Sequence, residues 1–365
     1  MAAEDTITSE PVSEAHPMRG GDGANSYAKN STFQKGAVDN AKQLLNKVIA
    51  EKLDLEILSS PSSFHIADLG CSVGPNTFSA VENIIEAVVL KYHSQLGLNV
   101  QIPEFQVFFN DHTSNDFNLL FKSLPQNRQY YAAGVPGSFY DRRFPEASLH
   151  LVHSSTALHW LSKVPAEVLD KNSLAYNKGR IHYSNATDEV IRAHETQYAV
   201  DMERFLHSRA QEVVYGGLMV LNIPGRPDGT THSYPFTKVT LQLLGSCLMD
   251  LVEKGVVSEE KVDSFNIPMY TMSPQELKAV VERNGCFSIE TITQLPLVVL
   301  ADRPNMALPQ LLAAHMRAGM EGIVKEHFGE EILDELFDLY LTKCEEHATT
   351  VETVTFLVVL KRKAD

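Results

Sequence analysis

Apolar residues in the first part of the chain fall into short runs that alternate with longer amphipathic stretches. Short runs rich in β-branched and aromatic residues predict strands at residues 64–70, 104–111, 130–139, 148–155 and 218–225. Stretches with apolar residues at helical spacing predict helices at residues 37–58, 76–95, 116–124 and 186–214. We expect Asn76 to cap the second of these helices and the pair Gly216–Gly217 to end the fourth. The alternation predicts a mainly parallel sheet with helices on both faces.

The pattern changes at about residue 231, where helical spacing becomes dominant. Helices are predicted at residues 236–255, 273–285 and 309–347, with one strand-like run at residues 286–295. We interpret residues 231–346 as a mainly helical cap. The β-branched residues 353–363 predict a last strand that returns to the sheet, so that the core comprises residues 17–230 and 347–365. Residues 17–36 are polar and Gly-rich, which predicts a loop or lid at the start of the core.

Composition and charge narrow the possible partners. The 365 residues are 44% hydrophobic and 21% charged, as in an ordinary globular protein. The formal net charge of −15 argues against nucleic acid or an anionic membrane surface as a partner, because both attract clustered Lys and Arg. The four cysteines show no C-x-x-C spacing, and no apolar run is long enough to span a membrane. Residues 1–16 read as a disordered tail without signal-peptide features, so we expect a reducing, cytoplasmic environment.

The run IADLGCSVGPNTF, residues 66–78, places a Gly-containing turn between a predicted strand and a predicted helix. Such a turn lies at the carboxyl end of a parallel strand, where α/β proteins bind ligands. A dinucleotide fold would need G-x-G-x-x-G, but the third Gly is missing and Pro75 removes an amide that phosphate would use. Asp68 repels phosphate and attracts a cation, and Asp111 follows the next strand, where a carboxylate can accept both ribose hydroxyls. The loop therefore favours S-adenosylmethionine over NAD, with Cys71 as a small apolar wall beside the ligand.

Six further stretches lie in an order and spacing that resemble one known family: MRGGDGANSYAKNS, FFNDHTSNDFNLLFKSLP, GVPGSFYDRRFP, HSSTALHWLSKVP, NKGRIHY and VDSFNIPMY. With the Gly-containing loop, they resemble the plant SABATH methyltransferases over nearly the whole chain. That family methylates small carboxylic acids and, in one branch, xanthine nitrogens. AAGVPGSFY, ALHWLSKVP and DKNSLAYNKGRIHY are most similar to its loganic acid branch. The resemblance implies a class I methyltransferase: an α/β, Rossmann-like fold with a mainly parallel seven-stranded sheet and a helical cap, assembled as a homodimer.

The resemblance also implies which residues bind S-adenosylmethionine and, after transfer, S-adenosylhomocysteine. The cofactor positions are Tyr27, Ser31, Asp68, Cys71, Asn76, Asp111, His112, Ser138, Phe139 and Ser155. Gln34 and Trp160 match the pair that holds the substrate carboxylate, and the further substrate-pocket positions are Tyr27, Thr156 and His159. His112 stands where the family often has Leu, and Thr156 stands where most members have Tyr, which widens the pocket. The first cap helix also lacks the His of loganate-type sequences.

The chemistry of these residues suits a carboxylate acceptor. A carboxylic acid is already ionised at pH 7, so no general base is needed, and neutral donors on Gln34 and Trp160 can fix it without a full positive charge. Without the resemblance, Trp160 would be read as a core residue and Gln34 as a solvent-exposed one. Three alternatives stay open: an N-methyltransferase of a heterocycle or alkaloid, a non-catalytic protein that binds a small acid, and an NAD-dependent oxidoreductase.

A final group of residues matches positions at which the family holds a hard cation, taken to be Mg²⁺. The group comprises Asn177, Asp263 and Asn266, which carry side-chain oxygens, and Phe265, which offers a backbone carbonyl. Because they come from separate parts of the chain, a cation there would join the core to the cap. The alternative is a turn held by hydrogen bonds alone.

Overall fold

The computed structural model describes residues 16–58, 62–300, 306–347 and 351–364, so nearly all of the expected tail lies outside the described residues. A central sheet has seven strands in the order β3-β2-β1-β4-β5-β9-β6. Its strands are β1 (Ser63–Leu69), β2 (Glu104–Asp111), β3 (Tyr131–Pro136), β4 (Leu149–Ser155), β5 (Val213–Pro224), β6 (Phe287–Gln294) and β9 (Thr355–Arg362). The pairs β1–β2, β1–β4, β2–β3 and β4–β5 are parallel, and only β9 runs antiparallel to its neighbours β5 and β6. The strands β7 (Val298–Leu300) and β8 (Val351–Thr353) form a small second sheet.

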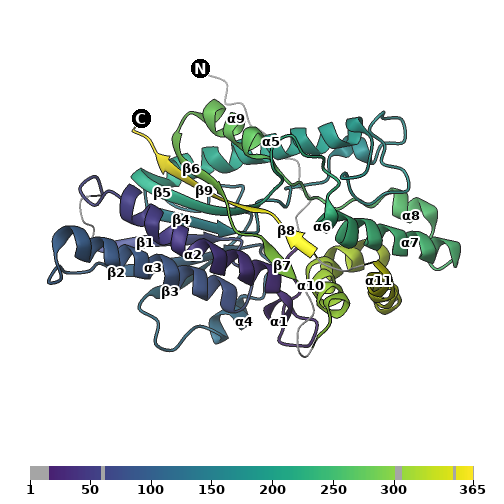
Figure 1. The fold of residues 1–365 in the computed structure, drawn as a ribbon, viewed down its shortest axis with the longest axis horizontal. Coiled ribbons are helices and arrows are strands. Elements are labelled where there is room, and N and C mark those ends of the chain that lie inside the picture. The colour runs from purple at the N-terminus through teal and green to yellow at the C-terminus, as the bar shows by residue number, and fades with distance from the viewer. Residues whose placement is uncertain (1–15, 59–61, 301–305, 348–350, 365) are drawn as a thin grey trace, which may run out of the picture.

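The helices divide between the sheet and the cap (Figure 1). Those of the core are α1 (Tyr27–Asn30), α2 (Thr32–Lys52), α3 (Pro75–Leu96), α4 (Phe117–Lys122), α5 (Asp188–Glu212) and α9 (Pro274–Asn284). Those of the cap are α6 (Pro235–Thr237), α7 (Leu243–Glu253), α8 (Glu259–Asp263), α10 (Leu308–Phe328) and α11 (Leu333–His347), with a π-helical segment at Lys238–Gln242 between α6 and α7. A short 3₁₀ helix occupies Ala166–Val168. This confirms the expected α/β fold of the class I methyltransferase type, with a mainly parallel seven-stranded sheet.

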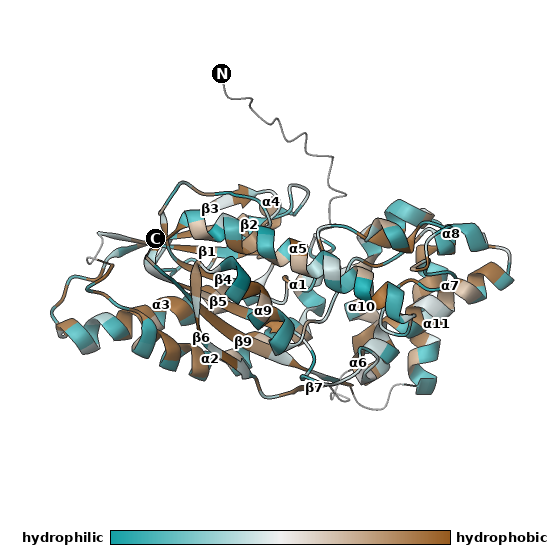
Figure 2. Cartoon of the chain, turned by 90° about the horizontal axis from the view of Figure 1, so that it is seen from above, coloured by the Kyte–Doolittle hydropathy of each residue, from teal (hydrophilic) through white to brown (hydrophobic). Residues whose placement is uncertain are grey.

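Both faces of the sheet are covered because successive strand residues point to opposite sides. On β1, Phe64 and Ile66 join a core formed with α2 and α3, while Ala67 and Leu69 join a core formed with α5 and α9. Figure 2 shows apolar residues concentrated along the strands, while the surface helices carry residues of both kinds. A third apolar core lies within the cap, between α7, α8, α10 and α11. None of the helices that the structure describes is long and apolar enough to cross a membrane.

Part of the segment assigned to the cap belongs to the sheet. Strand β6 pairs with β9 along its length, and α9 packs against α5 and β6. The predicted cap of residues 231–346 therefore includes elements that belong to the sheet. The sequence did not reveal this, because a single strand between long helices carries no pattern that identifies its partner strand. Helix α9 itself agrees with the expected range: Ser273 and Glu276 form a capping box, and Gly285 ends the helix at φ +74°.

Three expected helix limits were wrong for local reasons. Helix α2 begins at Thr32, inside the expected loop, so Gly36 lies within the helix. A glycine fits at this position because a Cβ would come 2.7 Å from the Val298 side chain. Helix α3 begins at Pro75 with Gly74 as its N-cap, so Asn76 does not cap it. Helix α5 ends at Glu212 and β5 starts at once, before Gly216, where an added Cβ would come 2.5 Å from Ile57. The glycines mark close packing at two of these places, not the end of an element.

Candidate active site

The loop after β1 takes a backbone path that needs small residues. Gly70 has φ +78°, Ser72 φ +50° and Gly74 φ +102°. A Cβ on Gly70 would lie 2.4 Å from the side chain of Ala157, so the position has both a conformational and a steric requirement for Gly. The amides of Gly70 and Cys71 donate to the carbonyl of Asn110 at 2.9 and 3.1 Å. The loop is thereby fixed over the carboxyl end of β2.

Asp111 ends β2 and holds this loop. Its Oδ2 accepts from the Ser72 amide and its Oδ1 from the His112 amide, both at 2.7 Å. Burial raises the pKa of the Asp111 carboxyl, and these two hydrogen bonds oppose the shift. Each carboxylate oxygen keeps a lone pair for a further donor. The arrangement suits a vicinal diol, which brings two hydroxyl donors to one carboxylate.

One cavity of about 730 Å³ lies where the parallel strands end and the cap begins. It contains residues from both predicted sets. The cofactor-type residues that line it are Tyr27, Asp111, His112, Ser138, Phe139 and Ser155, and the substrate-type residues that line it are Gln34, Thr156, His159 and Trp160. Pro17 and Met18 from the predicted lid line it as well. The fold thus brings together predicted cofactor and substrate residues that are up to 133 positions apart in sequence, from Tyr27 to Trp160.

Four predicted cofactor residues lie outside this lining: Ser31, Asp68, Cys71 and Asn76. Asp68 is buried beneath the loop, where it accepts from His153 Nδ1 at 2.7 Å and from the Thr77 hydroxyl. Asn76 donates to Ser31 Oγ at 2.8 Å, which ties the start of α3 to the start of α2. Asp68 and Asn76 are thus bonded to other protein groups, and none of the four residues is among those that line the cavity. The sequence could not separate residues that line the cavity from residues that bond to other protein groups beside it, because both kinds are polar residues of the same short motifs.

The loop after β4 carries three of the substrate-type residues, Thr156, His159 and Trp160. Thr156 has φ +54°, an unusual value for a β-branched residue, and its amide donates to Asn222 O at 2.8 Å. Trp160 is half-buried, and its carbonyl accepts from the Tyr140 hydroxyl at 2.6 Å. Trp160 also forms an isolated bridge with Met269 of the segment that follows α8. The main chain at Trp160 is therefore positioned by both the core and the cap.

Gln34 and His159 line the cavity, and each has a buried polar atom without a protein partner. Gln34 lies in the first turn of α2, and its Oε1 is buried without a protein partner. Rotation of the amide presents its NH₂ group at the same place. The Nδ1 of His159 is likewise buried and unpartnered. Burial, with a contribution from His315, lowers the pKa of His159 to about 4, so the imidazole is neutral at pH 7.

The cap adds a wall that the sequence did not reveal. It comprises Tyr234, Phe236, Thr237, Thr240 and Leu241 from the segment around α6, and His315, Met316, Gly319 and Met320 from α10. Burial lowers the pKa of His315 to about 4, and its ring centroid lies 4.8 Å from that of Phe33 on α2. The spacing of the α10 residues is that of one helix face. The same spacing describes any buried helix face, so it carried no signal for a ligand.

The residues expected to bind a cation do come together. Asn177 Nδ2 donates to Asn266 Oδ1 at 2.6 Å, and Asp263 accepts from the Gly179 amide at 2.8 Å and the Tyr176 hydroxyl at 3.1 Å. Asn177 Oδ1 is left buried without a protein partner. This is the geometry of a hydrogen-bonded turn and fits a cation only in part, since Asp263 and Asn266 already have donors. Within the described ranges, no group of three His, Cys, Asp or Glu residues is placed to hold a metal ion.

Comparison with known proteins identifies the family of this chain. The family model for S-adenosylmethionine-dependent carboxyl methyltransferases matches residues 13–363. Loganic acid O-methyltransferase of Catharanthus roseus is 50% identical over 364 residues, covering 96% of this chain and 95% of that protein. Farnesoic acid carboxyl-O-methyltransferase of Arabidopsis thaliana is 39% identical over 355 residues, covering 96% of this chain and 100% of that protein.

A solved structure described as loganic acid methyltransferase with S-adenosylhomocysteine superimposes with a TM-score of 0.88. It is 50% identical and covers 96% of this chain and 99% of that chain. At such identity and coverage, the match extends over the core, the cap and both loops of the cavity. The chain therefore belongs to the SABATH family of S-adenosylmethionine-dependent carboxyl methyltransferases.

Proposed function

We propose that the enzyme methylates the carboxylate of a small plant acid held by Gln34 and Trp160, and that loganic acid is the first substrate to test. The observation that carries the proposal is that the substrate-type residues line the same cavity as Asp111, Ser138 and Phe139. The 50% identity to a loganic acid O-methyltransferase supports the choice of acid. A screen of small carboxylic acids with labelled S-adenosylmethionine tests it, and methylation of other acids but not of loganic acid would contradict that choice.

On the cofactor side, we propose that Asp111 accepts the ribose hydroxyls and that Tyr27, Ser138, Phe139 and Ser155 surround the rest of the ligand. The left-handed loop and the half-buried carboxylate of Asp111 fit this ligand, because they combine close backbone approach with a charged acceptor. When bound, S-adenosylmethionine supplies an activated methyl group to the acid and leaves as S-adenosylhomocysteine. The four predicted cofactor residues outside the cavity lining, Ser31, Asp68, Cys71 and Asn76, then contribute indirectly by fixing the path of the loop.

On the substrate side, the residues supply positioning and neutral donors. The Gln34 amide and the Trp160 indole N–H can each donate to the carboxylate, and His159 stays uncharged beside them. Opposite charges on acid and methyl donor cancel during transfer, so a fixed cation here would stabilise the reactants more than the transition state. Orientation of an already ionised acid is what these side chains contribute.

Trp160→Phe keeps the aromatic shape and removes one donor. Loss of a hydrogen bond to a charged group costs about 1.5–3 kcal/mol, or roughly tenfold to a hundredfold in kcat/KM. We expect kcat/KM for the acid to fall by this factor while the affinity for S-adenosylhomocysteine stays nearly constant. Steady-state kinetics and calorimetry on the same preparation measure both. An unchanged kcat/KM would show that the indole N–H does not hold the carboxylate.

The N-methyltransferase alternative makes a different prediction for pH. Buried His159 and His315, each with its pKa lowered to about 4 by burial, are weak bases for removing a proton from nitrogen. With an acid as the substrate, the rate should be almost constant between about pH 6 and 8, because the acid is ionised throughout. A steep rise in rate over that interval, together with full activity in Trp160→Phe, would favour nitrogen as the acceptor.

A magnesium ion at the turn around Asn177 stays a prediction. The unpaired Oδ1 of Asn177 supports it, but Asp263 and Asn266 are occupied by hydrogen bonds, so we assign no catalytic step to a metal. We expect EDTA treatment to leave methyl transfer unchanged within about twofold, as for a turn without a cation. Metal analysis before and after chelation measures occupancy. Activity that is lost on chelation and restored by Mg²⁺ would contradict this expectation.

The quaternary structure and cellular location also remain proposals. We propose a cytoplasmic homodimer, on the basis of the family resemblance and the cysteine pattern of the sequence. Light scattering coupled to size exclusion gives the mass in solution, and a mass equal to one chain would contradict the dimer. Fractionation of the source tissue tests the location.

A further inference from the structure

The last turns of α5 hold a loop that borders the cavity. Arg209 and Glu212 form an ion pair, with Nε and Oε2 2.6 Å apart, and both side chains are fully buried. Arg209 donates to the carbonyls of Phe139 and Asp141, each at 2.7 Å. The pair therefore does more than neutralise itself, because the guanidinium also binds the main chain of residues 137–144.

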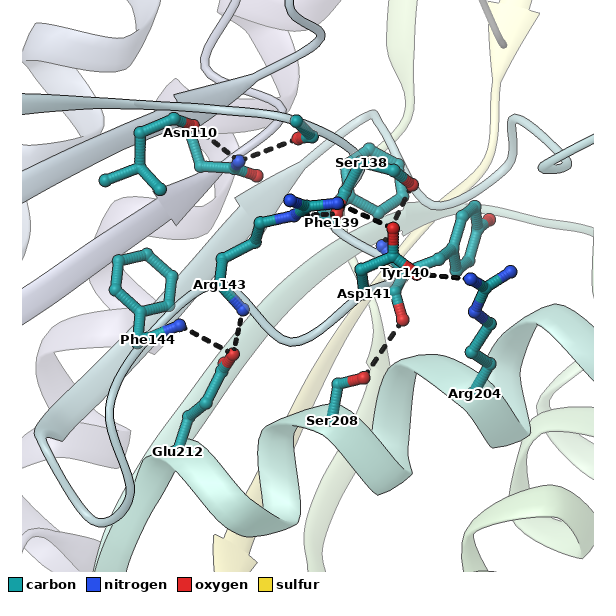
Figure 3. A network of polar contacts seen from close by, with 12 residues as sticks. Asn110, Ser138, Phe139, Tyr140, Asp141, Arg143, Phe144, Arg204, Ser208 and Glu212 are labelled. Atoms are coloured by element: carbon teal, nitrogen blue, oxygen red, sulfur yellow. Dashed lines mark hydrogen bonds and ion pairs between the residues drawn. The ribbon is translucent and has the colours of Figure 1, made fainter. Parts of the chain in front are cut away.

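The rest of this loop is held by the same helix turns (Figure 3). Glu212 Oε1 accepts from two main-chain amides of the loop, that of Phe144 at 3.0 Å and that of Arg143. Ser208 Oγ donates to the Tyr140 carbonyl at 3.0 Å. Together with Arg209, these side chains bind main-chain groups of the five residues Phe139, Tyr140, Asp141, Arg143 and Phe144.

A buried ion pair such as Arg209–Glu212 is not by itself a stabilising feature of a helix. A buried pair loses hydration, and well-packed apolar side chains of similar volume are often as stable or more stable. The contacts that apolar residues cannot make are those to the loop main chain. What the pair provides is thus a fixed position for Phe139 and its neighbour Ser138, which both line the cavity.

The helix reaches the substrate loop as well. The Tyr140 hydroxyl donates to the Trp160 carbonyl at 2.6 Å, so the held loop is linked to the main chain that carries the indole. About two turns nearer the start of α5, Asp201 accepts from the Ser162 amide at 2.8 Å and from the Ser162 hydroxyl at 2.6 Å. One rigid helix therefore fixes both the loop with the cofactor-type residues and the loop with Trp160.

We propose that Arg209, Glu212 and Ser208 are positioning residues that hold the loop of residues 137–144 in the conformation that binds the methyl donor and, through Tyr140, the conformation that binds the acid. The proposal rests on the roles given above to Ser138, Phe139 and Trp160. It distinguishes two transmission routes. Phe139 and Ser138 transmit the position of the loop to the cofactor, and Tyr140 transmits it to Trp160 and the acid.

The first test replaces the ion pair with apolar side chains, in the double variant Arg209→Met with Glu212→Leu. We expect a folded enzyme whose Kd for S-adenosylhomocysteine rises about tenfold, because several main-chain contacts to the loop are lost at once. At saturating cofactor and acid, kcat should fall by less than about threefold, since the reacting groups are unchanged. Arg192→Gln, at an exposed position of the same helix, is the matched control and should leave Kd and melting temperature unchanged.

The second test uses Tyr140→Phe, which keeps the ring and deletes only the link to Trp160. We expect KM for the acid to rise about fivefold with the Kd for S-adenosylhomocysteine within about twofold. A purely structural role would lower the melting temperature of both variants without separating these two constants. If the double variant does not fold, Ser208→Ala should raise the Kd for S-adenosylhomocysteine about threefold, as expected for one lost hydrogen bond.

The proposal is overturned if the folded double variant, or Ser208→Ala in its place, binds S-adenosylhomocysteine with unchanged affinity, or if Tyr140→Phe has an unchanged KM for the acid. Failure of the proposed function looks different. In that case the wild-type enzyme methylates none of the acids screened, while the double variant still shows its weakened binding of S-adenosylhomocysteine.

Discussion

Asp111→Ala is expected to weaken the binding of S-adenosylhomocysteine by at least about a hundredfold, because two hydrogen bonds to a charged acceptor are lost. The same change removes the acceptor for the amides of Ser72 and His112, each 2.7 Å from the carboxylate. The loop after β1 then loses its anchor at β2. Isothermal calorimetry with the purified enzyme measures the effect directly.

Two further variants isolate the cause. Asp111→Asn keeps one oxygen acceptor without charge and should weaken binding by about tenfold, between the wild type and the alanine variant. Glu104→Gln, at the exposed opposite end of β2, is a matched control and should bind normally. Since burial raises the pKa of Asp111, affinity should also decline in mild acid sooner than for an ordinary aspartate. Unchanged affinity in Asp111→Ala would contradict the assignment of Asp111 as the acceptor of the ribose hydroxyls.

The second large effect is a loss of stability in acid. Burial, aided by the charges of His194 and Arg180, lowers the pKa of His182 to about 3, and burial lowers the pKa of His194 to about 4. Both residues are almost fully buried and neutral in the folded state. In the unfolded chain a histidine binds a proton below about pH 6.5, so the unfolded state gains protons that the folded state does not.

The sign and the range of pH follow from this difference. Stability should be full above about pH 6.5 and should fall as the pH drops toward 4, by about 1.4 kcal/mol per pH unit for each buried histidine. The two residues together then remove several kcal/mol from the free energy of unfolding. Burial raises the pKa of Asp201 and of Glu276, and protonation of these carboxyls in the folded state offsets part of the loss.

Denaturant titrations between pH 4 and 8 measure this dependence. His194→Phe keeps an aromatic ring against Tyr183, whose ring centroid lies 5.1 Å away, and should reduce the slope by about one histidine's share. His347→Asn changes an exposed histidine at the end of α11 and should leave the slope as it is. A stability that is independent of pH between 4 and 6.5 would contradict the assignment.

Helix and strand periodicity predicted the α/β class, the parallel strands and most helices, because each amphipathic element records in its own sequence which side is buried. Family membership, the enzyme class and the cofactor were also evident from short motifs and are confirmed by the comparisons. These motifs are local: the loop around Gly70 turns at left-handed residues that are close together in the chain, although Asn110 and Asp111 of β2 hold it in place.

Tertiary structure decided what depends on contacts between distant segments. It placed β6 in the sheet, because strand pairing is a relation between two segments and only one of them is read at a time. It placed Asp68 behind the loop and Asp111 in the cavity, although both follow the same kind of apolar run. It also brought His315 of the cap to the cavity and joined α5 to the loop of residues 137–144. Such contacts arise from close packing in three dimensions, and the periodicity of a single segment contains no record of its partners.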